Sequence, residues 1–150
     1  MPAIYEHSLV VAPSDIDGLG HASNIAYVAW MQAAAVAHSS AQGWSGEMHR
    51  RLGAGWVVRS HQIRYQLPAL PGDQVLVRTW VAGLKRVSCL RCYEIIRRRD
   101  QSTLASAATE WAFIDFETGM PKRIPEEVAK AFVVVANQLD PARSFANWTR

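Results

Sequence analysis

Residues 23–42, SNIAYVAWMQAAAVAHSSAQ, decide the fold, because they predict one long helix that is apolar on nearly every side. Apolar side chains fill most positions from Ile25 to Ala37, and Gly43 stands where a helix commonly ends. A helix of this composition is typically buried, and its many alanines let other backbones approach closely. We therefore expect a sheet to wrap around it.

Runs typical of strands lie on both sides of this helix. One precedes it, at residues 4–12. Four more follow it, at residues 55–67, 74–82, 86–97 and 103–116. Short turn-forming segments separate these four, so each connection is predicted to be an antiparallel hairpin.

The chain closes with a second predicted helix, from Pro125 to about Gln138, whose first turn carries Glu126 and Glu127. Together the elements predict one α+β domain over residues 1–150. Its five-stranded antiparallel sheet is expected to wrap around the long helix.

The loop before the long helix, SDIDGLGHASN at residues 14–24, combines two carboxylates, two glycines and a histidine. The first N–H groups of a helix have no partner within the helix, and they lie at its positive dipole end. Asp17 lies just upstream, where its carboxylate can attack a carbonyl or activate water while those amides hold an oxyanion. Acyl transfer or hydrolysis is therefore the first chemistry to consider.

Composition sets limits on partners and location. The chain has 150 residues and a formal charge of +3, and its cations are spread out apart from the run Arg97–Arg99. That run reads as a solvated hairpin turn, so we expect no nucleic-acid partner. No stretch is long and apolar enough to span a bilayer and no signal pattern begins the chain, so we expect a cytoplasmic protein without a membrane partner.

Several familiar cofactor motifs are missing. Cys89 and Cys92 lie three apart on one predicted strand, so they point to opposite faces and are expected to be packed or partly exposed free thiols. The sequence has no G-x-S-x-G and no H-E-x-x-H, and the glycines at 18 and 20 lack the third glycine of a dinucleotide loop. We therefore expect no metal, flavin or nicotinamide.

Three groups of residues, taken in order, resemble the 4-hydroxybenzoyl-CoA thioesterase family of acyl-CoA thioesterases, which have the hot-dog fold. The first group surrounds the long helix start: Ser14–Asp17, Gly20, His21, Asn24 and Tyr27. The second comprises Trp56–Arg59, Tyr65, Pro68, Gly72 and Asp73. The third comprises Phe113–Asp115, Thr118, Gly119, Pro121 and Arg123–Pro125. The resemblance covers nearly the whole domain.

This resemblance implies an acyl-CoA thioesterase in which Asp17 is the catalytic nucleophile or general base. It also implies that a backbone amide near Asn24 binds the thioester oxygen. Some relatives carry a histidine at the position of Asn24, and here His21 lies three residues earlier. Coenzyme A would be part of the substrate and no separate cofactor is implied. Relatives pair their sheets edge to edge and build each site from two chains, which implies a homodimer or a homotetramer arranged as a dimer of dimers.

Each candidate also has a plainer interpretation. Asp17 can bind the backbone of its own turn, and Asp15 is expected to steady the loop. His21 can tune Asp17, donate to the substrate carbonyl or bond the helix start. The side chain of Asn24 can simply cap the helix.

The candidate substrate-binding residues also have two interpretations. Tyr27, Trp30 and Met31 can line an acyl pocket or belong to the core. Arg59 can meet a coenzyme A phosphate at a subunit boundary or stay solvated.

Two other functions fit the same pattern. One is a hot-dog hydratase or dehydratase that uses His21 and Asp17 on acyl thioesters. The other is a non-catalytic module that binds acyl-CoA and relays its occupancy to a partner.

Overall fold

The computed structural model describes residues 3–135. The strands are β1 (Tyr5–Val10), β2 (Ala54–Tyr65), β3 (Gln74–Leu84), β4 (Ser88–Arg97) and β5 (Ser102–Asp115). The helices are the 3-10 turn η1 (Pro13–Asp15) and the α-helices α1 (Asn24–Ala41), α2 (Gly46–Leu52) and α3 (Glu126–Ala129).

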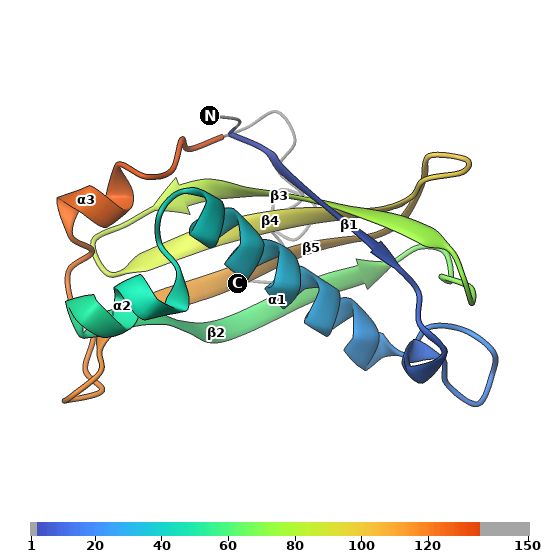
Figure 1. Ribbon diagram of the computed structural model, residues 1–150, viewed down its shortest axis with the longest axis horizontal. Helices are drawn as coiled ribbons and strands as arrows, with labels where there is room; N and C mark the ends of the chain where they lie inside the picture. Colours follow the sequence, from blue (N-terminus) through green and yellow to red (C-terminus); the bar gives the residue numbers. More distant parts are fainter. Residues whose placement is uncertain (1–2, 136–150) are drawn as a thin grey trace.

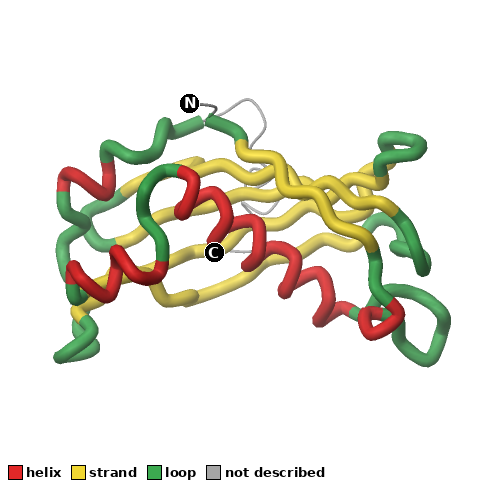
Figure 2. Tube along the Cα trace, in the orientation of Figure 1, coloured by secondary structure: helices red, strands yellow, loops and turns green. Residues whose placement is uncertain are grey.

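The five strands form one antiparallel sheet in the order β1-β3-β4-β5-β2. Figure 1 shows α1 lying diagonally across one face of this sheet. Figure 2 shows how the strands curve past the helix, with α2 and α3 gathered at the end of the molecule away from η1. The predicted α+β architecture, a five-stranded antiparallel sheet around one long helix, is confirmed.

One predicted hairpin is wrong. β2 pairs with β5, not with β3, because the free edge of β3 is taken by β1, where Tyr5 lies opposite Thr79. The connection between β2 and β3 instead turns back to the start of α1, where Ala22 donates its N–H to the carbonyl of Ala69 at 2.9 Å. The other two connections join neighbouring strands as predicted.

The helical predictions need two further corrections. The second helix ends at Ala129 because the chain then turns back to the sheet, where Phe132 is buried and Val135 donates to the carbonyl of Val81. The predicted helical residues 136–138 lie outside the described residues. α2 was not predicted, although Ser45 caps its start and Gly53 ends it at φ 77°.

One face of α1 supplies the centre of the core. Its buried residues recur every three or four positions and are Ala26, Tyr27, Trp30, Met31, Ala34, Ala35 and His38. The expectation that the whole helix is buried is wrong for this chain, because the sheet covers only this side. Ile25 and Val36 are 80% and 60% exposed on the other side.

Cys89 and Cys92 are buried and form no disulfide. Cys92 packs with Trp80 and Ala108, whereas Cys89 packs with Val81 and Phe132. The prediction that these thiols lie on opposite faces of β4, outside any disulfide, is confirmed. Burial raises the pKa of the Cys89 thiol to about 11, so this group stays protonated near neutral pH.

No helix within residues 3–135 is long and apolar enough to cross a membrane.

Replacing Met31 by alanine should test the core. Met31 has no exposed surface, so Met31→Ala should lower the free energy of unfolding by about 2–5 kcal/mol through lost contacts and a cavity. Met48→Ala removes the same atoms from a side chain that is 38% exposed and should cost less than about 1 kcal/mol. Urea denaturation measures both, and equal losses would contradict the assignment of Met31 to the core.

The imidazole of His38 should make stability depend on pH. His38 is 2% exposed, stacks on Tyr5 and accepts a hydrogen bond from Arg91 Nη1 at 2.9 Å. Burial, together with the charge of Arg91, lowers the pKa of His38 from 6.5 to about 4. The unfolded chain therefore binds a proton at this residue in the window from pH 6.5 to 4 that the folded chain does not, and folding weakens as the pH falls.

Between pH 7 and pH 5 this residue should remove about 2 kcal/mol of stability. His38→Gln keeps an acceptor for Arg91 but has no titrating ring, so its stability should fall less over the same range. Denaturation of both proteins at the two pH values checks this, and parallel losses would refute it.

Candidate active site

The loop between β1 and α1 is fixed by backbone hydrogen bonds. Asp15 Oδ2 accepts from the N–H of Ala12 at 2.9 Å, which closes the η1 turn. The carbonyl of Asp15 then accepts from the N–H of Ser23 at 2.8 Å, which ties this turn to the first residue before α1. Asp15 therefore steadies the loop, as expected from the sequence.

Asp17 closes a second, tighter turn. Its N–H donates to the carbonyl of His21 at 2.8 Å, and its Oδ1 accepts from the N–H groups of Leu19 at 2.8 Å and His21 at 3.3 Å. Gly20 fits this turn because it has a φ of 81°, which residues with a Cβ rarely adopt. The other carboxylate oxygen of Asp17, Oδ2, has no hydrogen bond within residues 3–135. The carboxylate is thus exposed, held through one oxygen and open at the other.

The first turn of α1 contains backbone N–H groups that have no partner among the described residues. Ser23 Oγ caps the helix by accepting from the N–H of Ala26 at 3.2 Å. Within the described residues, the N–H groups of Asn24 and Ile25 donate no hydrogen bond. A helix start with unpaired amides beside a carboxylate is suited to holding an anion or a developing oxyanion.

Two tyrosines, Tyr27 of α1 and Tyr65 at the end of β2, connect this helix start to the strand and to the loop that follows it. Tyr65 donates its hydroxyl to the carbonyl of Asn24 at 3.2 Å, and its ring meets the edge of Tyr27 at 5.0 Å between centroids. The Tyr27 hydroxyl accepts from the buried N–H of Ala69 at 3.0 Å. Burial raises the pKa of both phenols, which keeps them neutral. Tyr65 was part of the family resemblance but had no predicted role in the site, because its contact with the helix depends on where the long strand ends.

The other predicted site residues lie in different surroundings. His21 is exposed on the Asp17 turn, and only its backbone is hydrogen-bonded to Asp17. Trp30 and Met31 are buried with Tyr27 in the main core cluster. Arg59 is exposed on the edge strand β2 at a bulge between Val58 and Ser60. It lies six residues before Tyr65, about 20 Å along the strand, so one chain does not bring Arg59 to the helix start.

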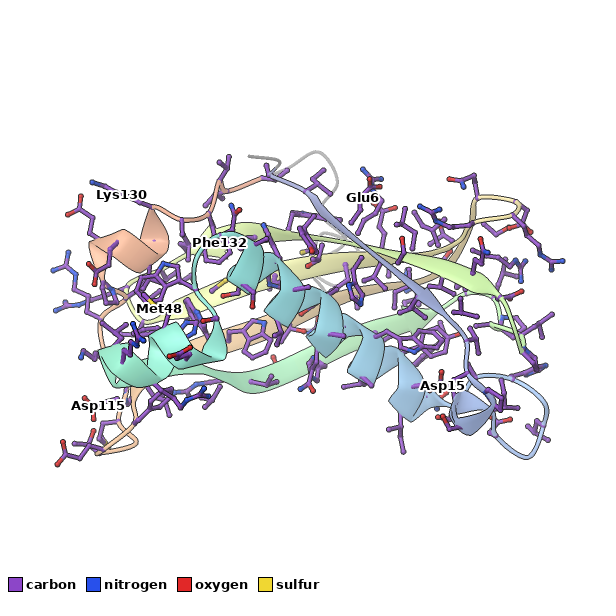
Figure 3. The ribbon with its side chains drawn as sticks, viewed as in Figure 1. Glu6, Asp15, Met48, Asp115, Lys130 and Phe132 are labelled. Carbon is purple, nitrogen blue, oxygen red and sulfur yellow. The ribbon has the colours of Figure 1, made fainter. Side chains whose placement is uncertain are left out.

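A cavity of about 310 Å³ lies at the far end of α1, and its walls include Trp44, Trp56 and Trp111. The walls do not include Tyr27, Trp30 or Met31. In Figure 3, Met48 and Phe132 mark this end of the molecule and Asp15 marks the other. The sequence did not predict this cavity, because it is formed by elements far apart in the chain.

Across residues 3–135, no three histidine, cysteine or acidic side chains gather in a way that could hold a metal ion.

Comparison with known protein families shows which superfamily the chain belongs to. Residues 11–132 match the model of the family described as the Thioesterase-like superfamily. The chain belongs to the thioesterase-like superfamily. The resemblance predicted from the loop, strand and turn residues is thereby confirmed. A search of curated proteins gave no match.

Solved structures share the hot-dog fold of this superfamily member. A 1,4-dihydroxy-2-naphthoyl-CoA thioesterase from Synechocystis is 20% identical, with a TM-score of 0.79 over 85% of this chain and 94% of that chain. A gentisyl-coenzyme A thioesterase is 22% identical, with a TM-score of 0.77 over 85% and 99%. A Staphylococcus aureus protein solved in complex with CoA is 12% identical, with a TM-score of 0.81 over 91% and 90%.

The hydroxyl of Tyr27 should matter more for stability than that of Tyr65. Tyr27→Phe leaves the buried N–H of Ala69 without its acceptor, which should cost about 1–3 kcal/mol. Tyr65→Phe removes an exposed hydrogen bond and should cost less than about 1 kcal/mol. Urea denaturation of the two variants checks the order, and a larger loss for Tyr65→Phe would reverse the assignment.

Proposed function

We propose that this protein hydrolyses an acyl-CoA thioester to a free carboxylic acid and coenzyme A. The observation that carries the proposal is the unpaired N–H groups of Asn24 and Ile25 beside the Asp17 turn, in a member of the thioesterase-like superfamily. The solved thioesterases with the same fold act on CoA thioesters, and a third relative was solved with CoA, which supports this substrate class.

Asp17 acts as the nucleophile or as the general base that takes a proton from water. The turn amides that hold Oδ1 fix the direction of the carboxylate and leave Oδ2 to face the thioester carbon. In either role one water is consumed, a C–O bond forms and the C–S bond breaks. Coenzyme A leaves as the thiolate and takes up a proton.

The amide of Asn24 binds the carbonyl oxygen as it becomes an oxyanion. Tyr65 fixes the adjoining carbonyl of Asn24, which holds this first turn in place. An oxyanion donor of this kind typically contributes about 10²–10³ in rate. The exposed His21 donates to the substrate or orients Asp17 from the same turn.

Substrate binding uses residues on both sides of this helix start. Tyr27, Trp30 and Met31 are core residues of the first two turns of α1, and the acyl group packs against the outer side of this part of the core. Arg59 meets a coenzyme A phosphate from a second copy of the chain, because in one chain it lies too far along β2.

The protein assembles as a homodimer, or as a dimer of dimers. Two surfaces support this proposal. β2 is an edge of the sheet with no strand beyond it within residues 3–135, and an open edge readily pairs with another copy. The face of α1 turned away from the sheet exposes Ile25 and Val36, which a second pair of chains would cover.

Asp17→Asn tests the chemistry. The amide can still accept the turn hydrogen bonds but is neither nucleophile nor base, so kcat should fall at least 10²-fold on the best acyl-CoA while the fold is retained. Thiol release from a panel of aliphatic and aryl CoA thioesters measures this. Asp15→Asn is the matched control and should stay within a few-fold of wild type.

Wild-type turnover by Asp17→Asn would remove Asp17 from the mechanism. If the wild type releases no thiol from any member of the panel, the proposed hydrolysis is wrong. Hydration of an enoyl-CoA would then identify the lyase, and tight binding without turnover would identify the binding module.

A further inference from the structure

The cavity at the far end of α1 is mostly apolar but contains arginine. Its walls include Trp44, Trp56, Trp111, Leu84 and Phe132. Among residues 3–135, its polar lining consists of Ser39, His49, Arg50 and Arg91 and includes no aspartate or glutamate. Phe116 and Val36, which are 48% and 60% exposed, also line it, so the cavity reaches the surface. Its volume of about 310 Å³ lies at the small end of the range for ligand pockets.

Arg91 is the unusual member of this lining. It lies in the middle of β4 and is 4% exposed. Its Nη1 donates to His38 Nδ1 at 2.9 Å and to Thr79 Oγ1 at 3.1 Å, and the guanidinium lies 5.7 Å from the ring centre of Phe132. Its Nε and Nη2 donate no hydrogen bond within residues 3–135, and no carboxylate of this part of the chain forms an ion pair with it.

Burying a guanidinium without a counter-ion costs desolvation free energy, and proteins normally pair such a charge with an opposite one. Arginine keeps its charge even when buried, so Arg91 cannot escape this cost by losing a proton as a lysine would. The two neutral acceptors, on His38 and Thr79, hold Nη1 of Arg91. The Nε and Nη2 groups are left to bind a ligand in the cavity that Arg91 lines. A carboxylate matches that fork in shape and charge.

The two acceptors also orient the arginine. Thr79 Oγ1 donates its own hydrogen to the carbonyl of Cys92, which fixes its lone pairs toward Arg91. His38 accepts through Nδ1, so its ring is neutral. Both partners thus hold the guanidinium without neutralising it.

We propose that this cavity binds a small monocarboxylic acid with an aromatic or short aliphatic body. The carboxylate pairs with Arg91 at the floor and the body packs against the tryptophan and phenylalanine walls. The site is about 20 Å along α1 from the Asp17 turn, as the rise from Asn24 to His38 indicates. The proposal does not depend on the proposed hydrolysis.

The walls favour a carboxylic acid over inorganic phosphate. Phosphate has no apolar part to cover the aromatic side chains, and a dianion would meet only one deeply buried cation. Arg50 lies at the exposed rim, where water screens its charge.

Isothermal titration calorimetry with benzoate, its neutral analogue benzamide, acetate and phosphate tests the proposal on the full chain. Benzoate should bind at one saturable site per chain. Benzamide lacks the charge and acetate lacks the body, so each should bind at least tenfold more weakly, and phosphate should not compete. Equal affinity for benzoate and benzamide, or no saturable benzoate binding, would overturn it.

Variants locate the bound acid. Arg91→Met keeps an apolar side chain of similar length and should weaken benzoate binding at least tenfold, whereas Arg91→Lys should retain part of it. Arg99→Met removes the same charge from the exposed turn between β4 and β5 and should bind as wild type. Asp17→Asn should also bind as wild type, even if the protein hydrolyses nothing.

Unchanged affinity in Arg91→Met, or loss in Asp17→Asn alone, would place the acid elsewhere and refute the site. If Arg91→Met does not fold, thermal unfolding of the wild type decides. Benzoate should then raise the melting temperature of the wild type by clearly more than benzamide does at the same concentration. Equal increases would refute the proposal.

Discussion

The contact between one face of α1 and the inner face of the sheet organises everything else in this molecule. Small residues such as Ala34 and Ala35 let the helix lie close to the strands, and the larger Met31 and Trp30 fill the space between them. This contact fixes the direction of the helix, and so fixes where its first and last turns lie. The Asp17 turn lies at the first end and the arginine-containing cavity at the other.

The helix start is held by more than its own cap. The carbonyl of Asp15 binds the N–H of Ser23, the carbonyl of Ala69 binds the N–H of Ala22, and Tyr65 binds the carbonyl of Asn24. These bonds come from three separate loops or strand ends. They leave the N–H groups of Asn24 and Ile25 without a partner in the described part of the chain. The rigidity of the surrounding backbone, and not the loop sequence alone, therefore makes this position suited to charge stabilisation.

Local patterns predicted much of the fold. The long helix, the five strands and the loop before the helix follow from apolar periodicity and turn residues, which act over a few positions. α2 was missed although its capping residues Ser45 and Gly53 are local signals. The other errors concern contacts between distant segments. The pairing of β2 with β5 depends on β1 taking the edge of β3, and the short α3 depends on Phe132 reaching the sheet.

The candidate site was predictable only in part for the same reason. The residues of the Asp17 turn are close in sequence, so their grouping was visible. The meeting of Tyr65 with Asn24, and of Arg91 with His38 and Thr79, depends on strand register and on the length of α1. No local pattern of residue types contains that information.

The position of β2 in the sheet has a consequence for how the chain folds. Its partner is the last strand, with Ala54 opposite Asp115 and Tyr65 opposite Ala105, so β3 and β4 come between them in the chain. During synthesis β2 emerges long before β5 and has no strand to pair with in the meantime. β3, β4 and β5 can form successive hairpins, but the sheet is complete only after a large loop closes, which makes this the entropically slow step of folding.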